Sequence, residues 1–89
     1  SQRLLQLKVA VMVKENDEQK LVEEIKEHAF PIRSRLLEIL SEKREDQAST
    51  LGYRAVLAAE LKVAMNDVLE ERTGGQHIEE LYFTEFIVQ

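Results

Sequence analysis

The sequence contains no cysteine, no tryptophan and a single proline among its 89 residues. Without cysteine, disulfide scaffolds, thiolate zinc sites and thiol catalysis are excluded. The chain also lacks any apolar run near the roughly 20 residues that a transmembrane helix needs. These absences leave a chain whose length suits one domain with one core, and we expect residues 1–89 to form it.

Basic residues are outnumbered, since 12 Lys and Arg against 17 Asp and Glu give a net charge of −5. Nucleic-acid binding needs Lys and Arg gathered on one face, and no stretch here is net basic for more than a few residues. The same acidic balance argues against adsorption of the folded surface to anionic lipid. Hydrophobic residues at 44% and charged residues at 33% are typical of an ordinary globular domain.

Apolar and polar side chains alternate over residues 3–14. Period-two alternation rich in Val and Leu predicts a strand with one buried face. The two expected faces carry Leu5, Leu7, Val9, Val11 and Val13 on one side, and Gln6, Lys8, Ala10, Met12 and Lys14 on the other.

An apolar stripe at three- and four-residue spacing predicts a helix over residues 17–43, with Asn16 or Asp17 as its N-cap. Pro31 lies inside this helix and has no backbone N–H to donate, so we expect a kink or restart near Ala29–Pro31. Because the stripe keeps its phase across Pro31, two nearly continuous segments are favoured over a loop.

A second helix is expected after the densely charged stretch 41–50, with Ser49 or Thr50 as its cap. Residues 55–72 have strong helix propensity. The glycine pair at 74–75 predicts the end of this helix, since glycine tolerates the left-handed conformation found there. Its apolar stripe is expected to consist of Tyr53, Leu57, Leu61, Ala64 and Val68, widened by Val56, Met65 and Leu69.

The last segment, residues 77–89, is dense in Ile, Tyr, Phe, Thr and Val, and this composition predicts a strand. Apolar residues on both faces indicate a strand that is buried on both sides or that turns one side to a partner. The expected faces are Leu81, Phe83 and Ile87 against Tyr82, Phe86 and Val88.

The order strand, kinked helix, helix, strand predicts an α+β fold, in which the terminal strands pair and the helices pack over one face. Two strands alone make a marginal sheet. We therefore expect a third strand, either short or upstream of Ser1. Without it, the exposed sheet edge becomes a site for assembly with another chain.

Few residues suggest chemistry. Glu24 and His28 have the spacing of a metal half-site on a helix, but no second pair completes it, and a helix-supporting pair or a partly buried His is the commoner explanation. His77 follows the glycine pair and is most simply a loop residue. No serine stands in a nucleophile-elbow pattern, and two-carboxylate chemistry stays open because Glu is common everywhere. No cofactor or metal site is predicted.

Glu85 stands out because it is a charged residue inside an aromatic strand. Such a residue usually lies at a sheet edge or pairs with a cation. A specific ion pair or an assembly contact explains it equally well. Arg33 and Arg35 are two residues apart, so they cannot share one helix face and form no anion clamp.

The C-terminal run resembles the terminal signature of the FliL family of flagellar basal-body-associated proteins. Residues 78–89 read IEELYFTEFIVQ, and members of that family typically end in a string such as VYFTEFVIQ. Here Leu81 replaces the usual Val, and the order near the end is Ile87-Val88. Residues 4–9 resemble the family's RYLKV strand, and residues 31–41 resemble its PxIRxxLLxLLS helix.

This resemblance implies a protein with a short cytoplasmic N-terminus, one transmembrane helix and a periplasmic domain. The present chain would be that periplasmic domain, without the membrane anchor and without an upstream strand segment that the family usually carries. The implied fold is similar to the stomatin/prohibitin (SPFH) domain, a scaffold that assembles into rings. The implied partners are the ion-driven stator units, MotA and MotB, whose torque or stability the protein would raise. No catalytic residue and no cofactor is implied.

The mechanism we expect is lateral assembly of a membrane-tethered domain beside the stator, which shifts the stator population toward its active form. Two hypotheses from other classes remain, a stomatin-like membrane scaffold unrelated to motility and a small enzyme with a deep polar pocket. Any single candidate residue is explained as well by a core or solvated position. The candidate assembly residues are Tyr82, Glu85 and Phe86 on the last strand, and Arg33 and Arg35 near the kink.

Overall fold

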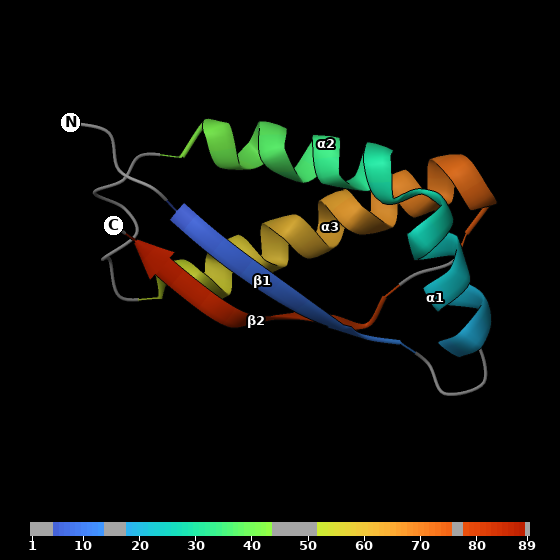
Figure 1. Ribbon diagram of the computed structural model, residues 1–89, viewed down its shortest axis with the longest axis horizontal. Helices are drawn as coiled ribbons and strands as arrows, with labels where there is room; N and C mark the ends of the chain where they lie inside the picture. The colour runs from blue at the N-terminus through green and yellow to red at the C-terminus, as the bar shows by residue number, and fades with distance from the viewer. Residues whose placement is uncertain (1–4, 14–17, 44–51, 76–77, 89) are drawn as a thin grey trace.

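A computed structural model of the chain describes residues 5–13, 18–43, 52–75 and 78–88. The molecule is elongated, with principal extents of 43 × 22 × 16 Å (Figure 1). The predicted α+β class is confirmed, with one strand near each end of the chain. The elements follow in the order β1 (Leu5–Met12), α1 (Glu18–Glu27), α2 (Ala29–Ser41), α3 (Tyr53–Thr73) and β2 (Glu80–Val88).

Some expectations concern positions outside the described residues. These are the four proposed helix caps and the loop position of His77, together with the side chains at the outer ends of the two strands. The positions concerned are Asn16, Asp17, Ser49, Thr50 and His77, and the side chains of Leu5 and Val88.

The two terminal strands pair antiparallel into a two-stranded sheet, as the sequence predicted. The alternation expected for β1 holds in part, because Leu7 and Val11 pack against the core while Lys8 and Ala10 are exposed. Val9, expected on the buried face, is 39% exposed. Within the described ranges no third strand joins this sheet.

The register of the sheet shifts once, between Lys8 and Val9. Lys8 lies opposite Glu85, whereas Val9 lies opposite Phe83, so Thr84 is an extra residue on β2. Its hydroxyl Oγ1 donates a hydrogen bond to the carbonyl oxygen of Lys8 at 3.3 Å. Because side chains alternate with a period of two, one extra residue reverses the faces of every residue that follows it.

This bulge makes the predicted faces of β2 wrong beyond Thr84. Phe86 lies opposite Leu7 and packs against the core on the same side as Phe83, not on the opposite face. Ile87 lies opposite Gln6 instead of sharing the face of Phe83.

The helix expected over residues 17–43 is formed by two helices, so the described chain has three helices where the sequence predicted two. His28 separates α1 from α2, with φ −107° and ψ 26°. Pro31 is the third residue of α2 and lies in the first turn, where a missing N–H costs no intrahelical hydrogen bond. Helix α1 lies across one end of the α2–α3 pair (Figure 1).

Helix α3 begins at Tyr53, two residues before the predicted stretch, and ends where the glycine pair predicted. Gly74 has the left-handed φ of 89°, and its N–H donates to the carbonyl oxygen of Glu70 at 3.0 Å. This bond satisfies one of the carbonyl groups that a helix end leaves free.

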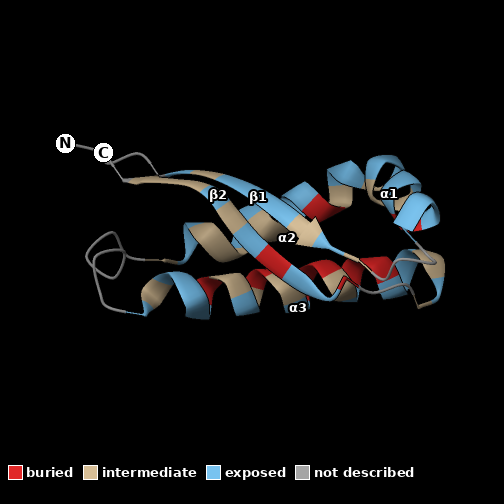
Figure 2. Ribbon diagram, turned by 90° about the horizontal axis from the view of Figure 1, so that it is seen from below, coloured by how far each residue is buried: buried red, intermediate tan, exposed pale blue. Residues whose placement is uncertain are grey.

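The core lies between α3 and the sheet, with α1 and α2 closing it. Figure 2 shows the buried residues along the side of α3 that faces the strands. A fully buried aliphatic side chain contributes roughly 1.5–3 kcal/mol, so α3 is the main source of hydrophobic stabilisation. The buried residues are Leu57, Leu61, Ala64, Met65, Val68 and Leu69 of α3, with Leu21, Ile32, Ile78 and Leu81.

The side chain of Asn66 fixes the entry of β2 against α3. Its Nδ2 donates to the carbonyl oxygen of Ile78 at 3.2 Å, and the backbone N–H of Ile78 donates to its Oδ1 at 2.7 Å. Ile78 is buried, and an unpaired buried backbone group would be costly. One amide side chain therefore satisfies both backbone groups of the residue that leads into β2.

Candidate functional site: two exposed surfaces

The described residues offer surfaces rather than a chemical centre. Among them no group of three His, Asp or Glu side chains is placed to hold a metal ion. Their polar and charged side chains all reach solvent to some extent. Several large apolar side chains are exposed, and surface apolar groups that gather in one place mark interaction sites.

The five predicted interaction residues lie in two separate regions. Arg33 and Arg35 are on α2, whereas Tyr82, Glu85 and Phe86 are on β2. Phe86 faces inward, where its ring meets those of Tyr53 and Phe83 edge to face, and these contacts explain its position as part of the core. The other four reach the surface.

The first surface is the face of the sheet that is turned away from the helices, which we call the outer face. Tyr82 is 49% exposed there. Lys8 and Glu85 lie directly opposite each other, and a cross-strand pair of opposite charge contributes roughly 0.2–1 kcal/mol. The register assigns to the outer face Gln6, Lys8, Ala10 and Met12 of β1, and Glu80, Tyr82, Glu85 and Ile87 of β2.

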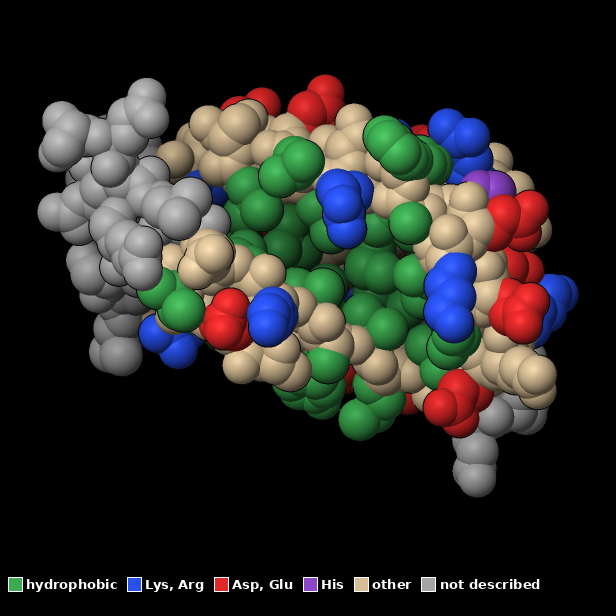
Figure 3. Space-filling view, in the orientation of Figure 1, with side chains coloured by type: hydrophobic (Ala, Val, Ile, Leu, Met, Phe, Trp, Pro, Cys, Tyr) green, Lys and Arg blue, Asp and Glu red, His purple; other side chains and the backbone are tan. Residues whose placement is uncertain are grey.

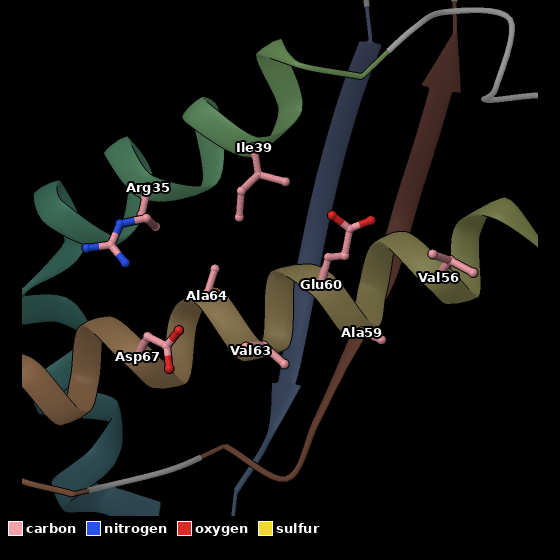
Figure 4. A pocket seen from close by; sticks show the side chains of 8 residues that line it. All are labelled: Arg35, Ile39, Val56, Ala59, Glu60, Val63, Ala64 and Asp67. Carbon is pink, nitrogen blue, oxygen red and sulfur yellow. The ribbon is translucent and has the colours of Figure 1, made fainter.

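The second surface is a groove of about 600 Å³ between α2 and α3, which we call the α2–α3 groove (Figure 4). Arg35 stands at one end and points toward α3 (Figure 4). Val56 is 60% exposed and Val63 is 57% exposed, so the groove presents apolar side chains to solvent. Its lining consists of Arg35, Ile39, Val56, Ala59, Glu60, Val63, Ala64 and Asp67.

Two ion pairs join α2 or its C-terminal end to α3 beside this groove. Arg35 Nη2 lies 3.3 Å from Glu71 Oε2. Lys43 Nζ donates to both carboxylate oxygens of Glu60, at 2.9 and 2.8 Å. The hydrogen bond to Glu60 raises the pKa of Lys43 above its ordinary 10.5, because it favours the charged ammonium. Arg35 is therefore half of a bridge between helices, while Arg33 is exposed on another side of α2.

Sequence reasoning missed the exposure of several apolar residues. It placed Val56 in the stripe of the second helix, but that side chain is exposed and is among the residues that line the groove (Figure 4). Phe30 is 89% exposed, and Leu37, seven residues later, is exposed as well. Their seven-residue spacing on the side of α2 opposite Ile32 and Ile39 is the signal that could have revealed them.

The fold and these surfaces define a small α+β domain whose described part offers apolar and charged contact surfaces. A comparison with models of protein families matches residues 1–89 to the family described as flagellar basal body-associated protein FliL. The chain therefore belongs to the FliL family, as its C-terminal run indicated. A search of curated proteins finds no match. None of the helices in the described ranges is long and apolar enough to cross a membrane.

Proposed function

We propose that this chain is the periplasmic domain of a single-pass inner-membrane protein at the flagellar basal body, where it supports stator units of the MotA and MotB type. The family match over all 89 residues carries this proposal, because the family is defined by its association with the basal body. The stator partner, the membrane anchor and the periplasmic location come from the resemblance of the sequence to that family.

The proposed action is binding rather than catalysis. A domain that binds the active form of a stator more tightly than the resting form shifts the population toward the active form, by no more than the difference in binding free energy. Tyr82 and Arg33 supply exposed side chains for such a contact, and Glu85 supplies a partly exposed one. Tyr and Arg are among the residue types that contribute most to protein interfaces.

We further propose that tethered copies assemble laterally into a ring with a stomatin-like arrangement. The α+β layout, with helices on one face of a small sheet, is compatible with that arrangement. Tethering confines copies to the membrane plane and raises their effective concentration. The isolated domain is therefore expected to assemble more weakly than the anchored protein.

Cross-linking in living cells tests the proposal, and the cysteine-free sequence suits it. Single cysteines would replace Tyr82, Glu85 or Arg33, with Glu23 on the exposed side of α1 as the matched control. We expect cross-linked dimers, or adducts with the stator, from Tyr82→Cys or Glu85→Cys, and neither product from Glu23→Cys. If cells that still swim give neither cross-linked dimers nor stator adducts at any of the three test positions, the assembly proposal is contradicted.

Deletion of the gene separates this proposal from its main alternative, a stomatin-like membrane scaffold that is not linked to motility. A deletion strain that loses swimming speed, with speed restored by the intact gene, supports the stator role. A deletion strain that swims at full speed favours the alternative.

A further inference from the structure

Helix α2 carries two large apolar side chains on its outer side, which we call the α2 ridge. They are Phe30, 89% exposed, and Leu37, 57% exposed. Seven residues separate them, so they stand on one side of the helix, about 10.5 Å apart along its axis. Figure 3 shows hydrophobic side chains along the edge of the molecule that α2 forms. Exposed apolar groups that gather in this way mark a contact surface.

The α2–α3 groove has dimensions that match this ridge. Val56 and Val63 in its lining are also seven residues apart, and both are exposed. Ala59 and Ala64 line it too, and their small side chains leave room for a larger one. Helices pack by fitting the side-chain ridge of one into a groove on another, with axes about 8–10 Å apart. The groove therefore suits an incoming helix that carries large apolar side chains.

The α2 ridge cannot enter the groove of its own chain. Ile39 of α2 lines the groove, whereas Phe30 and Leu37 are not among its described lining residues. Leu37 precedes Ile39 by two residues, which is about 200° around a helix. The ridge and the groove thus open on different sides of α2, and only the ridge of another copy can reach the groove.

The groove offers one carboxylate that the fold itself does not use. Asp67 lines the groove and is exposed. The other charged residues of the lining are already paired, Arg35 with Glu71 and Glu60 with Lys43. Within the described ranges Asp67 has no such partner. A partner surface with a cation would complete the groove.

Arg33 supplies that cation beside the α2 ridge. It is exposed, and it precedes Leu37 by four residues, which places both on the same side of α2. Like Asp67, it forms no ion pair with the residues that the structure describes. Opposite charges beside two apolar surfaces favour their contact and fix its orientation. The ridge and the groove therefore match in charge as well as in shape.

We propose that copies of this chain assemble head to tail, with the α2 ridge of one copy packed into the α2–α3 groove of the next. The contact joins two different surfaces, so each added copy presents a ridge or a groove to a further one, and the row closes into a ring where the rotation between copies allows it. This inference rests on the lateral assembly proposed above and adds the two surfaces that make it. The outer face of the sheet takes no part and stays open to another partner.

The contact is small, and this decides how it is tested. An aromatic side chain such as Phe30 buries about 150–250 Å², whereas a standard stable interface covers about 800 Å² on each partner. Two copies in dilute solution should therefore associate weakly. Anchoring in one membrane raises their effective concentration, so the full-length protein in its own cells is the right sample.

Cross-linking with a short bismaleimide tests the contact, since residues 1–89 contain no cysteine. One variant carries Leu37→Cys with Val56→Cys, and a second carries Leu37→Cys with Val63→Cys. Both are needed because parallel and antiparallel packing of α2 on α3 bring Leu37 to opposite ends of the groove. We expect a ladder of dimers, trimers and longer products from one of the two. The single variants should give no ladder, and Leu37→Cys with Glu23→Cys is the matched control, which should give none either.

Reversal of charge gives a second readout on the double variant that forms the ladder. Arg33→Glu should lower the yield of cross-linked products about threefold or more, because it places a like charge beside Asp67. Asp67→Arg added to Arg33→Glu should restore the yield. Lys20→Glu makes the same change of charge at an exposed position on α1, away from both surfaces, and should leave the yield unchanged.

Absence of a ladder from both double variants would overturn the inference. If Tyr82→Cys or Glu85→Cys still gives cross-linked dimers in that case, assembly itself stands and it uses other surfaces. Dimers from Leu37→Cys alone, without a ladder, would mean that two ridges meet symmetrically. Adducts of Leu37→Cys with a different protein, again without a ladder, would mean that this protein covers the ridge.

The proposed motor role fails in a different way. A deletion strain that swims at full speed would contradict that role, while a ladder from a double variant would still support the head-to-tail contact.

Discussion

Phe86 packs edge to face against Phe83, with ring centroids 5.3 Å apart and ring planes at 71°. Phe86 also meets Tyr53 at 6.3 Å, and Cζ of Arg54 lies 4.5 Å from the centroid of the Phe86 ring. Tyr53 and Arg54 begin α3, so this cluster ties the start of that helix to the last strand. The extra residue Thr84 makes the cluster possible, because it turns Phe86 to the inner face.

Replacing Phe86 by Ala is expected to cost about 2 kcal/mol of unfolding free energy, below the roughly 3–5 kcal/mol of a fully buried Phe because the ring is only partly covered. Phe30→Ala is the matched control, since that ring is 89% exposed, and it should change stability by no more than about 0.5 kcal/mol. Urea denaturation measures both. Equal losses for the two variants would contradict the inward placement of Phe86.

Asn66 should be one of the more sensitive polar positions. Asn66→Ala leaves both backbone groups of buried Ile78 without their partner, and we expect a loss of about 2 kcal/mol. Asn66→Asp keeps an acceptor for the Ile78 N–H but removes the donor to its carbonyl oxygen, so it should also destabilise the fold. Urea denaturation of both variants checks this expectation, and amide exchange at Ile78 should become faster in both. An unchanged unfolding midpoint for Asn66→Ala would contradict a stabilising role for the two hydrogen bonds between Asn66 and Ile78.

The pair between Lys43 and Glu60 predicts a dependence of stability on alkaline pH. The pKa of Lys43 is raised in the folded chain, so the folded state holds the lysine proton to a higher pH than the unfolded state does. The stabilisation is therefore complete below the ordinary lysine pKa of 10.5 and is lost as the pH rises through the higher folded value.

Unfolding midpoints between pH 7 and 11 for the unaltered chain and Glu60→Gln test this sign. The difference between them should be small, as for any exposed pair, and should shrink at the alkaline end. Glu38→Gln is a control, because Glu38 is exposed on the same helix pair and forms no ion pair within the described ranges. A difference in unfolding midpoint that grows above pH 10.5 would contradict a raised pKa of Lys43 in the folded chain.

Much of the fold could be predicted because its patterns are local. The alternation in β1 and the glycine at the end of α3 each identify an element from a few neighbouring residues. The antiparallel pairing of the terminal strands followed from their being the two strands available. By contrast, the bulge at Thr84 depends on how two strands far apart in sequence align, and no Gly or Pro marks it.

The candidate surfaces were predicted less well, because periodicity shows that a helix has apolar residues but not which of them a neighbour covers. Val56 and Leu57 adjoin in sequence, yet Leu57 is buried and Val56 is exposed in the α2–α3 groove. Pro31 indicated a break in the first helical stretch, but the residue between the two helices is His28. The outer positions of Tyr82 and Glu85 are placed by the register of the sheet, and their role as contacts stays a prediction.

The swimming speed of cells that carry Tyr82→Glu in the full-length protein tests the central claim most directly. This change adds a charge at a position that is 49% exposed on the outer face, so the fold should persist while a protein contact there is lost. We predict that these cells, with the variant at normal abundance, swim as slowly as a deletion strain, whereas Glu23→Lys on α1 restores full speed. Full speed with Tyr82→Glu at normal abundance would contradict the claim that the outer face of this domain acts on the motor.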